Sequence, residues 1–406
     1  MSADSSSLPL ATPRWPWLTR LRRRLPRLHH PRGFYLLCLA VLCERWAALI
    51  LSSSVVLMLG ERYGYARGDA LRLAGLFNAA SYLATLPGGL AVDHVLGSRR
   101  SLGVGMALLT LGYATLILST RDALWLALAL LLLGHSLFKP STQTVMVRLY
   151  EAHDRRFEAA QIACYLAINV GGTAGSLSAG LLVRDSDFRA AFLFAAAVLF
   201  AGYVLVFIGK SKLELRSNRP AITVAASPIQ KTLSPRYRAK IIVALTLAMM
   251  MYTISFGQVE GSLLLWAQER TDRVLLGFTI PAAWFVGLPS LLVLLLAPVQ
   301  LALLPRIQHR ITTPRLVAWG LIAIALGFAV LIPPALFSAG HRVSMLWLMA
   351  CMTLLVIGEL LVAPLGLSLL LRLAPPRFVG VVVGAWYVAG ALGCLLAGEL
   401  GAVWMR

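Results

Sequence analysis

Lys139 is the residue whose position in this sequence is hardest to explain by packing. It lies in the apolar stretch 124–150, LWLALALLLLGHSLFKPSTQTVMVRLY, which is long enough to cross a lipid bilayer as one helix. A lysine at the centre of such a helix costs about 2.5 to 3.5 kcal/mol on insertion scales. Chains tolerate this cost where the charge faces a polar cavity. The position of Lys139 therefore predicts a polar path inside a membrane.

Further ionisable residues lie inside apolar stretches. Glu44 and Arg45 follow each other about ten residues into the first one. Neighbours on a helix point about 100° apart, so we expect different partners: Lys139 for Glu44, and the carboxylate of a bound molecule for Arg45. A purely structural buried ion pair is the alternative. Glu359 lies between Gly358 and Pro364, where burial favours its protonated form, so it can hold a proton near neutral pH. When it is ionised, it can bind an ammonium group. A glutamic acid kept neutral for packing alone is the alternative.

Other residue types at mid-membrane positions complete this set. Pro140 has no amide hydrogen, so we expect a kink beside Lys139 and a free carbonyl near Ser136. A kinked helix that carries a cation at mid-depth is suited to anion binding. Three residues are candidates to line the cavity by hydrogen bonding or stacking: Tyr82, Asn169 and Trp284. The alternative is that they only pack at contacts between helices.

The elements that must position these residues are membrane-spanning helices. The chain has 406 residues, of which 59% are hydrophobic and only 13% are charged, whereas soluble domains average about 25% charged residues. The sequence predicts an all-α polytopic membrane protein with eleven spans. Their expected ranges are 34–60, 71–92, 101–119, 123–150, 157–183, 189–209, 240–267, 276–304, 315–338, 343–372 and 378–404.

The distribution of basic residues predicts the orientation. Although the formal net charge is +20, the basic residues crowd the loops between apolar stretches and do not follow one helix face, which argues against nucleic-acid binding. Most of them lie in the N-terminal tail, 1–32, and in alternate loops. This asymmetry predicts a cytoplasmic N-terminus in the inner (plasma) membrane. The tail has no apolar core typical of a signal peptide.

One polar, proline-punctuated segment, 210–238, divides the chain into two halves. We expect a cytoplasmic linker between a six-helix bundle, 33–209, and a five-helix bundle, 239–406. This layout resembles the two-bundle arrangement of major-facilitator transporters, which have two bundles of six helices, so a twelfth span is expected to be absent here. The segment from Gly89 to Arg100, GLAVDHVLGSRR, resembles the cytoplasmic GxxxD(R/K)xxGRR motif of that superfamily.

Four further segments resemble signatures of the proton-dependent oligopeptide transporter family. They are Gly134–Pro140 (GHSLFKP, for GxGLFKPN), Cys164–Gly171 (CYLAINVG, for FYxxINxG), Ile280–Phe285 (IPAAWF, for IPASWFQ) and Gly358–Ser368 (GELLVAPLGLS, for GELxxSPxGLS). Two weaker matches, Cys43–Trp46 and Trp266–Arg273, fall in the correct order, so the resemblance extends from the first span to the eleventh.

The resemblance implies a role for individual residues. In that family a lysine and arginines of the first helix bind the peptide carboxylate, which here corresponds to Lys139 and Arg45. An asparagine and a glutamate bind the amino end, which corresponds to Asn169 and Glu359. Glutamates couple transport to protons, which places Glu44 in the coupling set together with Glu359.

The chain also departs from the family pattern. Neutral residues occupy positions at which the family carries acids, bases or other polar groups: Val41, Ala48, Leu49, Ser52, Gly257 and Pro289. Glu260 lies three residues beyond Gly257, about 60° off the same helix face and about 4.5 Å along the axis. We hypothesise that Glu260 replaces the missing acid opposite Lys139. The alternative is a solvated charge at the outer mouth.

The sequence therefore favours a monomeric secondary transporter with no cofactor, driven by a proton gradient, for di- or tripeptides or related small zwitterions. Two alternatives remain open. One is transport, including export, of another peptide-like metabolite through the altered site. The other is a transport-inactive membrane sensor or partner subunit. An enzyme is not supported, because the HExxH and GxSxG motifs are absent from the sequence.

Overall fold

The computed structural model describes residues 30–150, 154, 156–183, 187–213, 234–308, 310–337, 341–375 and 379–404. Most of the predicted basic tail and of the predicted linker lies outside these residues. The helices before the linker are α2 (Arg32–Ser52), α3 (Val55–Glu61), α4 (Arg67–Leu83), α5 (Thr85–Ala91), the π-helical turn η1 (Val92–Leu96), α6 (Ser98–Leu116), α7 (Arg121–Arg148), α8 (Arg156–Leu182), α9 (Arg189–Ile208) and the short 3₁₀ turn η2 (Gly209–Lys212). We call this half the N-bundle.

The second half, the C-bundle, consists of α11 (Pro235–Glu260), α12 (Ser262–Glu269), α13 (Ala283–Gln308), α14 (Thr313–Ala329), α15 (Ile332–Phe337), α16 (Met345–Leu373) and α17 (Val379–Trp404). Four two-residue strands lie between these helices: β1 (Thr271–Asp272), β2 (Val274–Leu275), β3 (Phe278–Thr279) and β4 (Val343–Ser344). β1 pairs in parallel with β4, and β2 pairs antiparallel with β3.

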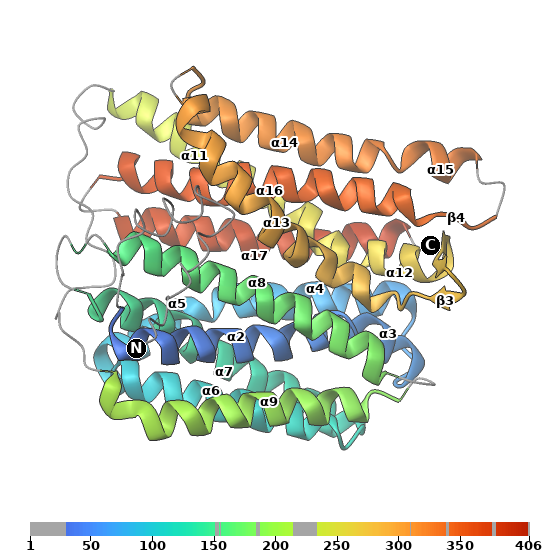
Figure 1. Ribbon diagram of the computed structural model, residues 1–406, viewed down its shortest axis with the longest axis horizontal. Coiled ribbons are helices and arrows are strands. Elements are labelled where there is room, and N and C mark those ends of the chain that lie inside the picture. Colours follow the sequence, from blue (N-terminus) through green and yellow to red (C-terminus); the bar gives the residue numbers. More distant parts are fainter. Residues whose placement is uncertain are drawn as a thin grey trace, which may run out of the picture.

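The two bundles lie side by side with their helices running along the long axis of the molecule (Figure 1). We call the end that carries the β2–β3 hairpin the hairpin end, and the opposite end, where residues 213 and 234 lie, the linker end. Among the described residues, nine helical segments are long and apolar enough to cross a membrane. The spans expected over 71–92 and 101–119 are also helical in the structure, as α4–α5 and α6.

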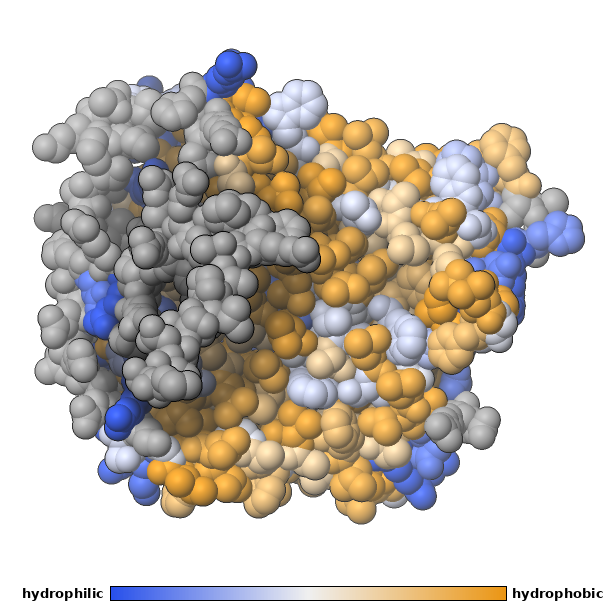
Figure 2. All heavy atoms as spheres, in the orientation of Figure 1, coloured by the Kyte–Doolittle hydropathy of each residue, from blue (hydrophilic) through white to orange (hydrophobic). Residues whose placement is uncertain are grey.

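The surface agrees with a protein that spans a bilayer. Hydrophobic side chains cover the middle of the molecule, and hydrophilic residues gather toward its two ends (Figure 2). Large apolar side chains of several helices are more than half exposed, among them Leu111, Phe200, Leu295 and Trp319. Such a surface is unfavourable in water and is satisfied by lipid. The expected fold class, an all-α membrane protein with two bundles, is confirmed.

The predicted span over 276–304 is wrong at its beginning. Residues 274–279 form the β2–β3 hairpin, and the helix begins only at Ala283. Leu276 and Gly277 have φ angles of 51° and 80°, which a helix does not contain. The run is apolar enough to resemble a membrane helix, but its backbone turns back at these two residues. The predicted linker also ends earlier than expected, because α11 begins at Pro235.

The contacts that join the two bundles include a close crossing of α4 and α17 in the half of the molecule nearer the hairpin end. A Cβ atom at Gly75 would lie 2.8 Å from the carbonyl oxygen of Cys394 and 2.9 Å from the Cα of Gly398. The absence of a side chain therefore lets the two backbones approach closely. Two ion pairs cross the same interface: Arg67 to Glu269, at 2.7 Å, and Arg72 to Glu399, at 3.0 Å.

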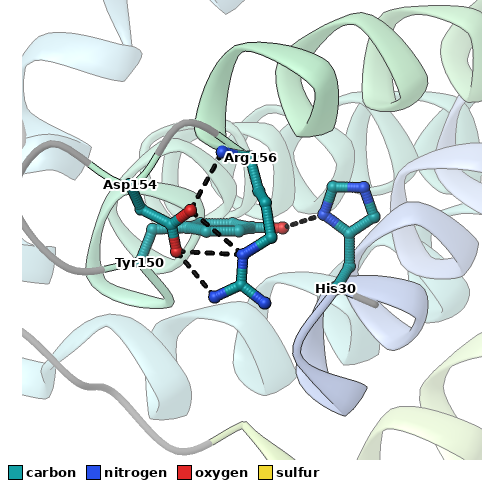
Figure 3. A network of polar contacts seen from close by, with 4 residues as sticks. All are labelled: His30, Tyr150, Asp154 and Arg156. Carbon is teal, nitrogen blue, oxygen red and sulfur yellow. Dashed lines mark hydrogen bonds and ion pairs between the residues drawn. The ribbon is translucent and has the colours of Figure 1, made fainter. Parts of the chain in front are cut away.

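At the linker end, a polar network connects the beginning of α2 with the α7–α8 connection (Figure 3). The Tyr150 hydroxyl lies 2.9 Å from Nδ1 of His30, and Arg156 forms an ion pair with Asp154 at 2.7 Å. The hydrogen bonds from Arg156 lower the pKa of Asp154 to about 2. Burial, followed by repulsion from Arg156, lowers the pKa of His30.

Candidate functional site

Glu44 lies inside the N-bundle and faces α7. Its Oε1 is 3.2 Å from Nε2 of His135, and the two side chains are only 5% and 7% exposed, respectively. Lys139, one turn further along α7, is a second electrostatic neighbour of Glu44. The direct partner of Glu44 is therefore His135, whereas the sequence had suggested Lys139.

Arg45 points in a different direction from Glu44, as expected for consecutive helical residues. Its Cγ lies beside Gly172 of α8, where Ser290 of α13 also approaches. Its side chain thus reaches the place where α8 of the N-bundle meets α13 of the C-bundle. Its Nε is buried without a hydrogen-bond partner among the described residues. A buried guanidinium nitrogen without a partner is available to an anion that enters the interface.

Lys139 is half-buried, and its Nζ lies 5.9 Å from the centroid of the Tyr82 ring. None of the ion pairs found within the described part of the chain involves Lys139. α7 continues as one helix through Pro140, and the carbonyl oxygen of Ser136, which Pro140 leaves without its usual donor, faces Gly88 of α5. The nearby charges that act on Lys139 are those of Glu44, Arg45 and Glu260.

Glu359 occupies the middle of α16 in the C-bundle. Its carboxyl group interacts with the Tyr252 hydroxyl of α11 and, across the bundle interface, with the charge of Arg45. Tyr165 of α8 also interacts electrostatically with Glu359. Asn169, one turn away from Tyr165, donates its amide hydrogen to the Tyr165 carbonyl oxygen at 2.9 Å. This bond leaves the side-chain oxygen of Asn169 as a possible hydrogen-bond acceptor.

Glu260 lies at the contact between the bundles. Its Oε2 accepts a hydrogen bond from Nδ2 of Asn78 in α4, at 3.1 Å, and both residues line a small cavity between α4, α11 and α17. Glu260 also interacts electrostatically with Lys139. A Cβ at the neighbouring position Gly257 would meet the Cβ of Ala397 at 2.5 Å, so α17 fills the space beside Gly257.

Trp284 is placed apart from these residues. Its indole Nε1 donates to the carbonyl oxygen of Leu177, at 3.3 Å, and its ring lies against Gly180 and beside Phe278. Gly180 is about 12 Å further along α8 than Gly172, which adjoins Arg45. The structure therefore places Trp284 at the α8–α13 contact near the hairpin end.

The structure brings most of the expected residues together around the interface between the bundles. Cations project from the N-bundle, and Glu359 and Glu260 project from the C-bundle. Three residues that the sequence had not singled out belong to the same region: Asn78, His135 and Tyr252. A signal for His135 exists in the sequence, because His135 and Lys139 are four residues apart and share one face of α7.

Comparison with known proteins supports the fold and the family. The sequence profile of the Major Facilitator Superfamily matches residues 37–398. A peptide transporter of Yersinia enterocolitica, YePEPT, is 28% identical over 83% of this chain and 80% of its own length. Dipeptide and tripeptide permease A of Chromobacterium violaceum is 27% identical over 91% of this chain and 85% of its own length. The resemblance to oligopeptide transporters found in the sequence motifs is thus confirmed over nearly the whole chain.

Solved structures show the same fold. A peptide transporter POT in complex with sulfate superposes with a TM-score of 0.84 and 24% identity, covering 93% of this chain and 89% of that one. A POT family transporter in complex with 5-aminolevulinic acid gives a TM-score of 0.78 and 21% identity, covering 93% of this chain and 91% of that one. At these identities the likeness establishes the arrangement of the helices.

Proposed function

The chain belongs to the Major Facilitator Superfamily, and from this premise we propose that it is a proton-coupled symporter of di- and tripeptides or related small zwitterions. One observation carries the proposal: Arg45 lies on the N-bundle, Glu359 lies on the C-bundle, and the two charges interact across the interface. A zwitterionic peptide has a carboxylate at one end and an ammonium group at the other. It therefore matches the charges of both bundles at once and stabilises their approach around it.

Each residue has a role in this proposal. Arg45 and Lys139 bind the carboxylate of the peptide, because both are cations that lack an ion-pair partner among the described residues. Glu359 and the side-chain oxygen of Asn169 bind the ammonium group. The ring of Tyr82, which already lies beside the Lys139 ammonium, forms a wall of the site. Trp284 contributes to substrate binding from the α8–α13 contact.

Proton coupling is assigned to the carboxyl groups of Glu44, Glu359 and Glu260. Glu359 binds the substrate ammonium when ionised and releases it when protonated, so arrival of the co-transported proton at Glu359 releases the amino end of the peptide. A membrane potential of about 100 mV contributes about 2.3 kcal/mol for each elementary charge that crosses. Coupling one proton to an uncharged zwitterion is therefore sufficient to drive accumulation.

Transport follows from alternating access between the two bundles. The Gly75 crossing, the ion pairs of Arg67 and Arg72, and the Asn78–Glu260 hydrogen bond join the bundles in the half nearer the hairpin end. Separation of these contacts gives the opposite state. In the proposed orientation the N-terminus and the linker are cytoplasmic, the monomer spans the plasma membrane, and the hairpin end faces outward.

The test is uptake of labelled dialanine into proteoliposomes, with and without an inward proton gradient. The proposal predicts gradient-dependent accumulation that Lys139→Ala reduces by about 10- to 100-fold, since a charge-assisted contact of about 1.5–3 kcal/mol is lost. Arg310→Ala, at an exposed position between α13 and α14, is the matched loss of a cation and leaves uptake unchanged. Binding of dialanine without any flux contradicts the transporter proposal and favours a sensor.

A second candidate is transport of a peptide-like molecule that is larger or less charged than a dipeptide. It is supported by position 257, where the family carries an acid and this chain has glycine. Ala397 of α17 occupies the space that a side chain at this position would need. Competition by N-acetylated or amidated dipeptides separates the two candidates. Competition stronger than that of dialanine favours the second.

A further inference from the structure

A buried pair of ionisable residues lies inside the N-bundle, beside the cationic groups that face the other bundle. The carboxylate of Glu44, on α2, and the imidazole of His135, on α7, approach to 3.2 Å, and both side chains are more than nine-tenths buried. Neither residue is needed to bind a peptide in the proposed function. Burying two ionisable groups is unfavourable unless each stabilises a charge on the other.

Several polar atoms around this pair have no partner among the described residues. They include Nδ1 of His135 and the hydroxyl of Tyr113 on α6. Tyr113 is also an electrostatic neighbour of Glu44. Buried polar atoms are nearly always hydrogen-bonded in folded proteins. Two such atoms in one region indicate a place that accepts an additional proton or a water molecule.

The imidazole is suited to accept that proton. When Nε2 carries the hydrogen and faces Glu44, Nδ1 has a lone pair and no donor to fill it. Addition of a proton at Nδ1 converts His135 into an imidazolium ion. The neighbouring carboxylate then stabilises the positive charge, and histidine is the side chain that changes its charge most readily near neutral pH.

We propose that the Glu44–His135 pair is a proton-binding site of the transport cycle, at which one proton from the aqueous phase binds to Nδ1 of His135 and later returns to it. The pair changes its net charge from −1 to 0 when it takes up the proton. The charged groups that act on it electrostatically are Arg45, on α2, and Lys139, one turn further along α7. The unprotonated pair attracts both cations, and the protonated pair releases them toward the carboxylate of a peptide.

The role of the pair rests on the proposed symport, but its protonation can be measured without transport. ¹⁵N-histidine NMR of the protein in proteoliposomes follows each imidazole from roughly pH 4 to 9. His135→Gln and, independently, His135→Asn identify the resonance by its loss. Glu44→Gln is expected to move the midpoint of the His135 titration to lower pH by about one to three units, because the stabilising carboxylate is removed. The exposed His94, on η1, supplies the control resonance.

A His135 that does not titrate in this range, or an equal midpoint in the wild type and Glu44→Gln, overturns the inference. In a second arm, the pH profile of gradient-driven dialanine uptake is compared between wild type, His135→Gln and His94→Gln. Loss of the pH dependence in His135→Gln alone supports the proposal, and an unchanged profile overturns it. If the wild type transports no peptide, the proposed function fails, while the NMR titration still decides whether the pair binds a proton.

Discussion

Replacement of Asn78 by alanine is expected to open the hairpin end of the protein. The side chain of Asn78 donates to the Glu260 carboxylate across the interface between the bundles, at 3.1 Å, and both residues are half-buried. A hydrogen bond to a charged group contributes about 1.5–3 kcal/mol. Because 1.4 kcal/mol corresponds to about a tenfold change in an equilibrium constant, Asn78→Ala should reduce the ratio of the closed to the open hairpin end by about 10- to 100-fold.

The structure contains a matched control for this prediction. Arg67 and Glu269 also join the bundles, but their side chains are 60% and 34% exposed. Ion pairs exposed to solvent contribute about 0.2–1 kcal/mol and are screened by salt. Glu269→Gln should therefore change the same ratio by less than about fivefold. If electrostatic contacts at the interface acted only through their number, the two variants would have equal effects.

The ratio can be measured as a distance between the two bundles at the hairpin end. Leu118, between α6 and α7, and Leu336, on α15, are 65% and 70% exposed and accept spin labels in a variant without the native cysteines. Electron–electron double resonance should show a longer distance population that increases in Asn78→Ala and changes little in Glu269→Gln. An unchanged distribution in Asn78→Ala, or an equal shift in both variants, would refute the reasoning.

Three further predictions concern other parts of the molecule. Gly75→Val should shift the same distance distribution toward the open form, because its Cβ would lie 2.8 Å from a backbone oxygen of α17. Overpacking of this kind costs about 1–3 kcal/mol. A closed distribution identical to that of the wild type would contradict the close crossing. Glu359→Gln should remove the preference for dialanine over N-acetyl-dialanine in competition assays, because the affinity for dialanine falls by about 10- to 100-fold. A retained preference would show that another group binds the ammonium. Burial and Arg156 lower the pKa of His30 from 6.5 in the folded protein, so the stabilisation that neutral His30 contributes is present above pH 6.5 and is lost as the pH falls through the folded pKa. We expect a hydrogen bond donated by the Tyr150 hydroxyl to Nδ1 of His30 to be part of this stabilisation. Thermal unfolding from about pH 8 to about pH 5 should therefore show an acid destabilisation that Tyr150→Phe reduces by about 0.5–1.5 kcal/mol, and an equal pH dependence in both proteins would exclude this bond as its origin.

The sequence was sufficient to predict the helices, because apolar runs of membrane length have few other structures available to them. It failed where an apolar run is interrupted by local backbone geometry. Residues 274–279 are as hydrophobic as a helix, yet Leu276 and Gly277 form a turn and the segment becomes a hairpin. The exposed Leu276 shows that hydrophobicity by itself does not distinguish a span from a loop near the membrane surface.

The charged residues of the candidate site could also be selected from the sequence, because a charge inside an apolar run is rare. Their partners could not, since helix periodicity specifies a face and not the neighbour that packs against it. Glu44 was assigned to Lys139, and its direct partner is His135, one turn earlier on the same face. Asn78 and Tyr252 were not recognised, because neither carries a charge at neutral pH and both resemble ordinary helix-interface residues.

The most direct test of the central claim is electrical. Dialanine carries no net charge at neutral pH, so any charge that moves with it must come from coupled protons. Rapid addition of dialanine to proteoliposomes on a solid-supported membrane should produce a current of positive charge into the vesicles, and Lys139→Ala should abolish it. Uptake of dialanine without a current, or a current that Lys139→Ala leaves unchanged, would contradict proton-coupled transport at this site.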